Sequence, residues 1–540
     1  MNAGYGMLST DAAAAEKFIG SRVAVSPLGC VTKARADGSK KHRVIMDLKL
    51  NLVNSASTTT ERQVLPTVWQ HARDISILTS ELRLAGADAN LWSMVLDFKD
   101  AFMSIPLSDK EWSFNVCLLD HDVHRDRAEL FPHEVSVGRC VVWRVLGFGG
   151  KANPLVFSRA AAFAARSGQA LLRPRVHGPG CGEVAPGRLQ LYVDDPLCTF
   201  LGTEASCARA ADLLVTWWLV LGVPLSWGKG LWTSEAHRWI GAIFENRVVM
   251  GRAAGIIKVP PDFGDELFDL LTPLSKGTGL VTDKFLEKAL GKAGRLSYLI
   301  PAVRPFVAAL WGAWSGSRDA HTEKRREAPP GQHAAKRFSS SARWLQFLLR
   351  PTPSDSELLP LEQVVVAELP AISGKEATIH VDASPWGGGA VLFEDGVATE
   401  VFIMTWTSLD EKQLKVKIGD PAGQTAFEYY AILLTLIIFA TRFRDTGLAI
   451  LSDNIAAVNG AITLKGKNNL TIVTRELAWR KVRYGWRFAA AHLPAEMNTL
   501  ADALSRLSAP SGSDRKCFPQ ALATCVKQPA PDPDDVWRCK

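Results

Sequence analysis

The chain has 540 residues, of which 47% are hydrophobic and 22% are charged, and its formal net charge is +7. This length and composition exclude a disordered or fibrous protein and indicate about three or four globular domains. The mildly basic balance suits a nucleic-acid partner without establishing one.

Membrane insertion and secretion are not indicated. The most apolar run, Ala431 to Ala440, is about ten residues long, which predicts a buried helix and not a membrane span. The N-terminus lacks the basic-then-apolar pattern of a secretion signal. Nine cysteines without regular spacing favour reduced thiols. We therefore expect an intracellular protein of the cytoplasm or nucleus.

Composition shifts divide the chain into an α+β multidomain protein. The predicted segments are an Ala-rich leader (1–22), an α+β domain (23–245), a helical region with a basic linker (246–345), a connector (346–375), an α/β domain (376–507) and a disordered tail (508–540). Within the helical region, apolar residues at helical spacing predict a helix over 284–299. The polar stretch from Gly316 to Ser341 predicts a linker or an exposed loop.

In the first domain, acidic residues stand at the ends of predicted strands. Asp97 closes the apolar run of a strand that begins at Ser93, and Asp194 and Asp195 follow a second strand. Two carboxylates about 4 Å apart repel by roughly 4 kcal/mol at an effective dielectric constant near 20. The pair therefore lies either on a solvated hairpin turn or opposite a cation. Together the two strands would deliver carboxylates to a pair of Mg²⁺ ions about 3.5–4 Å apart.

The second α/β domain also carries acidic residues on its predicted strands and helices. Asp382 lies on a strand that a Gly-rich hairpin turn joins to the next strand, and Glu428 opens an apolar helix. Asp453 ends a buried-type strand, and Asp502 lies in "HLPAEMNTLADALSR" (492–506). Each of these acids has an ordinary structural explanation when it is taken alone. The order of strand Asp, helix Glu, strand Asp and helix Asp is the more specific signal.

Residues 23–245 resemble the fingers and palm of a reverse transcriptase. The similar segments are "KARADGSKKHRVIMDLKLN" (33–51), "DFKDAF" (97–102), "RVLGFGGKANPLVF" (144–157), "YVDD" (192–195) and "GKGLWTSEAHRWIGAIF" (228–244). The resemblance implies that Asp97 and Asp194 ligate both metals, with Asp195 in support. It further implies that Lys229 protonates pyrophosphate, although an exposed loop lysine is the alternative.

The same resemblance implies a nucleotide-binding set. Its members are Lys33 and Arg43 on the incoming triphosphate, Phe102 as a steric gate against a ribose 2′-hydroxyl, and the neighbouring Phe148 and Gly149. A core aromatic is the alternative for Phe102. The chain departs from the family at two positions: Gly147 replaces a proline that would pre-set the turn, and Phe148 stands where retroviral enzymes carry glutamine.

Residues 376–507 resemble a ribonuclease H domain. The resemblance implies that Asp382, Glu428, Asp453 and Asp502 bind two Mg²⁺ ions and that the domain hydrolyses RNA in an RNA–DNA hybrid. It also implies that His492 lines the site, with a core or surface histidine as the alternative. The segment "TRELAWRKVRYGWRF" (474–488) predicts either a contact with the hybrid backbone or a solvated basic face.

Taken together, the chain resembles the reverse transcriptase and ribonuclease H of a retrotransposon, most like tyrosine-recombinase (DIRS-type) elements and next like Ty3-like elements. The implied architecture is a right-hand polymerase (fingers, palm, thumb) followed by a ribonuclease H-like domain. The implied cofactor is Mg²⁺, two ions per active site, with Mn²⁺ as a substitute. The implied partners are an RNA template, a DNA primer, an RNA–DNA hybrid, dNTPs and other element-encoded proteins.

Two other functions are consistent with parts of this pattern. An RNA-dependent RNA polymerase would share the arrangement of carboxylates in the palm. Phe102 and the four acidic residues of the second α/β domain argue against this function. A catalytically inactive or domesticated retroelement protein that only binds nucleic acid is the other alternative, and Gly147 leaves room for it.

Overall fold

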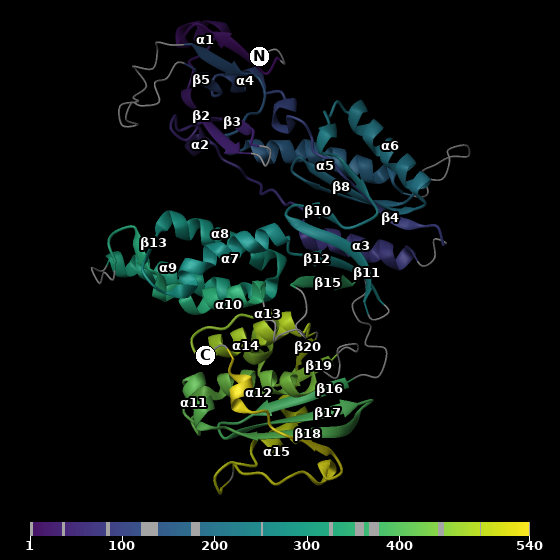
Figure 1. The fold of residues 1–540 in the computed structure, drawn as a ribbon, viewed down its shortest axis with the longest axis vertical. Coiled ribbons are helices and arrows are strands. Elements are labelled where there is room, and N and C mark those ends of the chain that lie inside the picture. Colours follow the sequence, from purple (N-terminus) through teal and green to yellow (C-terminus); the bar gives the residue numbers. More distant parts are fainter. Residues whose placement is uncertain are drawn as a thin grey trace. The chain divides into compact units, whose positions relative to one another are not determined.

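The structure is a computed structural model. It describes residues 4–34, 38–82, 87–119, 139–173, 184–249, 252–322, 328–350, 361–366, 377–440, 448–486, 488–512 and 514–538. The chain forms two compact units, one built mainly from residues up to 240 and the other mainly from residues after 256 (Figure 1). Both units mix helices with strands, which confirms the predicted α+β class.

One sheet of the first unit has the strand order β1-β6-β5-β2-β3. Its strands are β1 (Gly6–Ser9), β2 (Val25–Ala34), β3 (Lys40–Met46), β5 (Val116–Leu118) and β6 (Cys140–Trp143). The predicted leader takes part in this sheet, because β1 pairs antiparallel with β6 and α1 (Ala12–Ile19) buries Ala15 against the neighbouring strands. The β2–β3 hairpin carries the predicted triphosphate-binding residues.

A second sheet of the first unit has the order β7-β8-β4-β9. Its strands are β4 (Asn90–Val95), β7 (Gly187–Tyr192), β8 (Asp195–Gly202) and β9 (Leu231–Thr233). The longer helices of this unit are α3 (Val68–Leu82), α5 (Asn153–Leu171) and α6 (Glu204–Val220). Shorter elements are α2 (Val53–Ala56), η1 (Ala101–Ser104), α4 (Asp109–Trp112), η3 (Trp227–Lys229) and β10 (His237–Trp239). The residues of β11 (Ala242–Val249) and β12 (Arg252–Lys258) are divided between the two units.

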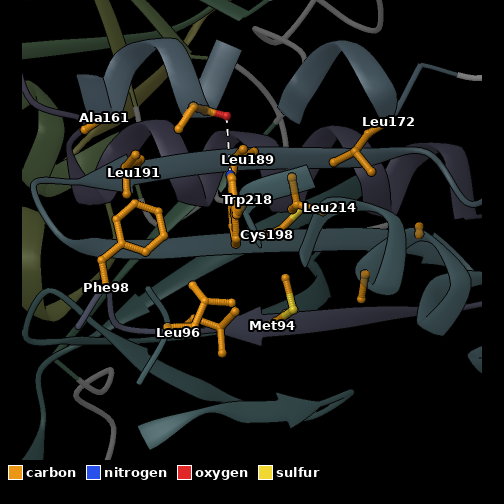
Figure 2. Close-up of a cluster of buried hydrophobic side chains, with 14 of the residues drawn as sticks. Met94, Leu96, Phe98, Ala161, Leu172, Leu189, Leu191, Cys198, Leu214 and Trp218 are labelled. Atoms are coloured by element: carbon orange, nitrogen blue, oxygen red, sulfur yellow. Dashed lines mark hydrogen bonds between the residues drawn. The ribbon is translucent and has the colours of Figure 1, made fainter. Parts of the chain in front are cut away.

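A hydrophobic core fixes the second sheet to its helices (Figure 2). Met94 from β4, Leu96 and Phe98 from the segment after it, and Leu214 and Trp218 from α6 are all buried there. The rings of Phe98 and Trp218 meet edge to face with centroids 5.4 Å apart. Because Leu96 and Phe98 are both anchored in this core, the intervening residue Asp97 is held at a fixed place beyond the end of β4.

A pair of buried histidines predicts a pH-dependent stability for the first unit. The Nε2 atoms of His71 and His237 lie 2.9 Å apart, and the rings of Trp239 and Phe244 pack against His71. Burial lowers the pKa of His71 and lowers that of His237 to about 4, so both rings are neutral at pH 7. Unfolded histidine titrates near about pH 6.5, so the unfolded chain gains protons first on acidification. The free energy of unfolding should therefore fall as the pH drops from about 6.5 to about 4.

For His237 alone this pKa difference lowers the free energy of unfolding by about 3 kcal/mol at pH 4, and it has no effect above pH 7. Guanidinium unfolding at several pH values would measure it. His237→Gln should reduce the slope in this window, whereas the exposed control His42→Gln should leave it unchanged. An equal slope in all three proteins would contradict this prediction.

The second unit begins with a group of helices. They are α7 (Pro261–Lys276), α8 (Asp283–Leu299), α9 (Arg304–Thr322) and α10 (Ser339–Leu349), with the short elements β13 (Leu280–Thr282), η4 (Pro301–Val303), β14 (Gln332–Ala334) and η5 (Ala335–Phe338). Buried residues at helical spacing along α8, such as Leu286, Leu290 and Leu296, confirm the helix predicted over 284–299. Strand β15 covers Glu362–Val366.

The prediction of a linker or exposed loop over 316–341 is wrong for most of its length. Helix α9 continues to Thr322, and β14 pairs antiparallel with β13. His333 is 1% exposed and is hydrogen-bonded to Ser317 (2.8 Å) and Asp283 (2.8 Å). The polar composition of the stretch conceals this buried network, because averaging over many exposed residues hides one that is fully enclosed. Residues 323–327 lie outside the described part of the chain.

The rest of the second unit contains a sheet with the order β20-β19-β16-β17-β18-β21. Its strands are β16 (Ala377–Ala383), β17 (Gly387–Glu394), β18 (Val397–Thr405), β19 (Leu448–Ser452), β20 (Phe488–His492) and β21 (Val526–Gln528). Its helices are α11 (Ser408–Leu414), α12 (Gln424–Phe439), α13 (Ile455–Thr463), α14 (Leu470–Arg483), α15 (Thr499–Ser505) and α16 (Pro533–Val536), with 3₁₀ turns η7 (Pro421–Gly423), η8 (Ala495–Met497) and η9 (Gln520–Leu522).

Helix α12 is the apolar helix that the sequence predicts as buried. The segment Pro421–Phe439 is the single helix of the described ranges that is long and apolar enough to cross a membrane. Most of its side chains are enclosed, since 72% of its most apolar window is buried in the fold. This degree of burial is typical of a core helix.

The predicted Gly-rich hairpin turn is wrong in detail. Gly387, Gly388 and Gly389 all lie within β17 and pair with β18, and the last two also pair with β16. A Cβ atom on Gly389 would lie 2.5 Å from the Cβ of Leu504, so the glycine allows α15 to approach the sheet closely. A requirement for close packing against a helix that is distant in sequence leaves no local signal, which explains the error.

The predicted disordered tail is also wrong. Strand β21 extends the sheet by pairing in parallel with β18, and Leu522 and Trp537 are buried. The Nε1 of Trp537 donates to Oδ1 of the buried Asp410 (3.0 Å), and the hydroxyl of Tyr430 donates to the same oxygen (2.6 Å). Proline and aspartate make up nine of the 33 residues of the tail, but these few apolar side chains decide its burial.

Candidate active sites

The structure brings Asp97, Asp194 and Asp195 together at the end of the β7–β8 hairpin. Val193 and Asp194 form its turn, and Val193 has a φ of 56°, a left-handed conformation that is rare for a β-branched residue. The N–H of Phe98 donates to the carbonyl of Asp194 (2.8 Å), which holds the segment containing Asp97 against the turn. The acidic pair thus lies on a turn and also faces a third carboxylate. Strain at such a position is typical of functional sites.

The electrostatics of this first cluster favour a bound cation. Burial, followed by the charges of Asp194 and Asp97, raises the pKa of Asp195 to about 6. Burial also raises the pKa of Asp194, with a further contribution from Asp97, while Lys229 and Arg43 oppose the rise. A positive charge among the three carboxylates would relieve this repulsion.

Lys229 is exposed, as the alternative interpretation predicts, but it also contacts the first cluster. It lies in η3, and its ammonium group donates to Oδ2 of Asp97. The backbone reinforces this arrangement, because the N–H of Ser226 donates to the carbonyl of Asp97 (2.8 Å). The predicted proton donor therefore lies beside a predicted metal ligand.

A cavity of about 440 Å³ adjoins the first cluster. Six of the predicted site residues line it: Arg43, Asp97, Phe102, Phe148, Asp194 and Lys229. Phe102 both lines this cavity and packs against Phe157, with ring centroids 5.2 Å apart. The ring of Phe102 therefore combines the predicted gate position with the alternative core role.

Phe148 forms a link between the predicted gate and the predicted triphosphate arginine. Its ring centroid lies 5.4 Å from that of Phe102, and the guanidinium carbon of Arg43 lies 5.7 Å from it. This contact is a cation–π interaction. An aromatic ring at this position thus contacts Arg43, where a glutamine would offer hydrogen bonds instead.

The remaining predicted nucleotide-binding residues are placed differently. Gly149 is not among the lining residues of the cavity; it has a φ of 119°, and a Cβ there would lie 2.0 Å from the carbonyl oxygen of Met46. Gly147 also packs on Met46, whose flexible side chain would have to shift for an added Cβ, since its Cε would lie 2.7 Å away. Lys33 lies on β2, but its side chain falls outside the described part of the chain.

The second cluster joins Asp382, Glu428 and Asp453. Each offers a carboxylate oxygen, and these oxygens lie within 4.8 Å of one another. Strands β16 and β19 are parallel neighbours, so Asp382 and Asp453 emerge at the same end of the sheet. Glu428 comes from the first turns of α12 and is 2% exposed.

The second cluster is more deeply buried than the first. Burial raises the pKa of Asp382 to about 7 and raises the pKa of Glu428 well above its usual range. The side-chain amide of Gln424 donates to Oε1 of Glu428 (2.9 Å), whereas the buried Oε2 has no hydrogen-bond partner among the described residues. An orphaned buried oxygen beside two further carboxylates fits a hard divalent cation, which binds through oxygen ligands.

Asp502, the predicted fourth acid, is not a member of this trio. The Nε of Arg506 donates to its Oδ1 (2.6 Å) and the ammonium group of Lys516 donates to its Oδ2. Burial alone would raise the pKa of Asp502, but these hydrogen bonds hold it below its ordinary value. Its charge still acts on the pKa of Asp382 and of Asp453, so it lies near the cluster with its oxygens engaged by two cations.

His492 is exposed, which excludes the core alternative. It lies in register with Ser452 on the neighbouring strand, next in sequence to Asp453, and its charge acts on the pKa of that aspartate. The basic segment 474–488 fits neither predicted role at two of its arginines. Arg480 donates to Glu476 (2.5 Å), and Arg483 donates to the carbonyls of Phe347 and Leu348, so both are buried structural groups.

Sequence reasoning missed four side chains that contact the second cluster or Asp502, namely Gln424, Ser505, Arg506 and Lys516. Helical spacing is a usable signal for the first three, since each lies three or four positions from a predicted acid. Lys516 carries no such signal because it belongs to the tail.

No protein-family model matches the chain. No curated protein matches it. Among solved structures, the chain is similar to a foamy viral protease-reverse transcriptase in complex with dsDNA, with 14% identity, a TM-score of 0.43, and coverage of 91% of this chain and 80% of that chain. The foamy viral protease-reverse transcriptase dRH in complex with dsDNA matches with 13% identity, a TM-score of 0.40, and coverage of 86% and 65%.

A third solved structure, the foamy viral protease-reverse transcriptase in complex with an RNA/DNA hybrid, matches with 14% identity, a TM-score of 0.38, and coverage of 87% of this chain and 50% of that chain. This chain thus spans between half and four fifths of the length of these proteins. We therefore base the functional proposal on the two carboxylate clusters.

Proposed function

We propose that the chain is an RNA-directed DNA polymerase with ribonuclease H activity, of the kind encoded by retrotransposons of the DIRS or Ty3-like type. One observation carries the proposal: the chain holds two separate clusters of carboxylates at the ends of β-strands, one in each unit. The first cluster lies beside a nucleotide-sized cavity, which suits polymerisation. The second cluster groups three carboxylates that could hold divalent cations, which suits metal-dependent hydrolysis.

In the first unit, Asp97 and Asp194 would hold the metal ions and Asp195 would support them. Arg43 would bind the triphosphate from the open side of the cavity, oriented by the ring of Phe148. Lys229, whose ammonium group contacts Asp97, would give a proton to the departing pyrophosphate. When bound, paired Mg²⁺ ions at either cluster supply activation of the attacking oxygen and stabilisation of the leaving one.

In the second unit, Asp382, Glu428 and Asp453 would hold the cations, and Asp502 would join them once Arg506 or Lys516 releases one of its oxygens. Exposed His492, in register with the residue before Asp453, would line the rim of the site. The expected partners are an RNA template, a DNA primer, dNTPs, the hybrid product and other element-encoded proteins, in the cytoplasm or nucleus.

The test is a pair of assays on the full chain. Primer extension with dNTPs on an RNA template, and cleavage of a labelled RNA–DNA hybrid, should both require Mg²⁺ or Mn²⁺. Hybrid binding without either reaction, in a folded protein, would instead favour the inactive nucleic-acid-binding alternative. Extension with rNTPs in preference to dNTPs would favour an RNA-dependent RNA polymerase.

Replacing Phe102 tests the proposed selection against ribonucleotides. Phe102→Val should raise the efficiency of rNTP incorporation relative to dNTP by at least about tenfold. The smaller valine side chain would open space where a 2′-hydroxyl would project. Single-nucleotide extension with each substrate measures the ratio. Phe157→Leu, which changes the ring behind Phe102 and not the cavity wall, is the matched control. An unchanged ratio in Phe102→Val would remove the gate role and leave Phe102 as a core residue.

A further inference from the structure

A serine hydroxyl contacts the second cluster from the helix that carries Asp502. The Oγ of Ser505, the last residue of α15, donates to Oδ2 of Asp382 at 2.5 Å. Ser505 is 1% exposed, and its carbonyl accepts a hydrogen bond from the hydroxyl of Ser384 at 2.7 Å. Both the side chain and the backbone of Ser505 are therefore tied to the strand and turn that carry Asp382.

The hydroxyl of Ser505 has a competing local acceptor, the carbonyl of Asp502 one turn earlier, at 3.0 Å. Serines within helices often make such local bonds. A hydroxyl has one proton, and the contact with Asp382 is both shorter and made to a carboxylate, so it is the stronger of the two. The distant contact is thus the one that determines where the proton points.

The glycines of β17 make this contact geometrically feasible. An added Cβ on Gly389 would lie 2.5 Å from the Cβ of Leu504 and 3.0 Å from the carbonyl of Ala501. An added Cβ on Gly387 would lie 3.1 Å from the carbonyl of Ser505. A side chain at Gly389 would push α15 away from the sheet, and a shift of about 1 Å would break a 2.5 Å hydrogen bond.

We propose that Ser505 is a positioning residue for the second cluster. It fixes the rotation of the Asp382 carboxylate toward Glu428 and Asp453 and couples that carboxylate to the helix bearing Asp502. This inference deepens the proposed hydrolytic site and rests on it. Ser505 would accordingly set the affinity of the cluster for a divalent cation, because partners that orient a ligand commonly contribute tenfold to a hundredfold in metal affinity.

The test measures metal binding directly. Mn²⁺ titration calorimetry is done on the full chain in an Asp194→Asn background, which weakens the first cluster so that the heat reports on the second. Ser505→Ala should raise the dissociation constant for Mn²⁺ by at least about tenfold. Ser505→Thr, which keeps the hydroxyl, should retain most of the affinity, and Ser505→Cys, a weak donor, serves if Ser505→Ala does not fold.

A matched control separates positioning from general destabilisation. Thr435→Val removes another buried hydroxyl, one on α12 that has no hydrogen-bond partner among the described side chains, and should leave the dissociation constant unchanged. Equal affinities in Ser505→Ala and the parent would overturn the proposal, as would an equal loss in Thr435→Val. If the parent binds Mn²⁺ in a Ser505-dependent way yet never cleaves a hybrid, the proposed function fails and the positioning role stands.

Discussion

Replacement of Asp194 by asparagine is expected to lower Mg²⁺-dependent dNTP incorporation by about a thousandfold or more. Asparagine keeps the shape of the side chain but removes the negative charge that the proposed metal ions require. The thermal midpoint should stay the same or rise, because burial and Asp97 already disfavour the charged form of Asp194. Primer extension on an RNA template, together with circular dichroism melting, measures both effects.

Two comparisons sharpen this experiment. Asp212→Asn makes the same chemical change at an exposed position of α6 and should leave extension unchanged. Hybrid cleavage by the Asp194→Asn protein should persist, because the second cluster is built from other residues. Full extension activity in a folded Asp194→Asn protein would remove Asp194 from the proposed polymerase site.

Replacement of Asp382 by asparagine should produce the reverse pattern. Hybrid cleavage is expected to fall by about a thousandfold or more, while primer extension continues. Asp382 is 4% exposed and lies with Glu428 and Asp453 in a cluster whose oxygens are within 4.8 Å of one another. Burial and the neighbouring carboxyl groups already disfavour the charged form of Asp382, so replacing it should keep or raise thermal stability in metal-free buffer, and a loss of activity would not reflect unfolding.

The control for Asp382 lies in the same sheet. Asp395 is exposed in the turn between β17 and β18, where its φ of 51° suits asparagine, so Asp395→Asn should change neither activity nor stability. Loss of both activities in Asp382→Asn would mean that the two clusters do not act as separate sites. Loss of neither would show that the second cluster is structural.

The sequence predicted the positions of the carboxylates because each stands at the end of a strongly patterned element. Asp97, Asp194 and Asp453 follow apolar strands, and Glu428 lies near the start of an apolar helix, which begins at Gln424 and not at Glu428 as predicted. The elements and the acids could therefore be located together to within a few residues. The packing contacts that orient these acids could not be predicted. Ser505 reaches Asp382 across more than a hundred positions of sequence, and the contact depends on glycines in a third segment.

The wrong predictions for the linker and for the tail have the same physical cause. Average polarity described most of their residues correctly, but His333 and Trp537 are buried and fix the course of the chain around them. A single enclosed aromatic or imidazole group that has satisfied hydrogen bonds outweighs many solvated neighbours in deciding whether a segment packs. Such a residue is recognised only when its partner is known, as Asp410 is for Trp537.

The packed tail also affects how the second unit completes its folding during synthesis. Trp537 follows Asp502 by 35 positions (537 minus 502), so at roughly 5–20 residues per second it is translated about 2 to 7 s later. During this interval β18 would be an edge strand paired only with β17, and the buried Asp410 would lack one of its donors. Unpaired edges favour association between nascent chains. Fragments that end at residue 507 would remain in this incomplete state, with the proposed site residues present and the sheet edge open.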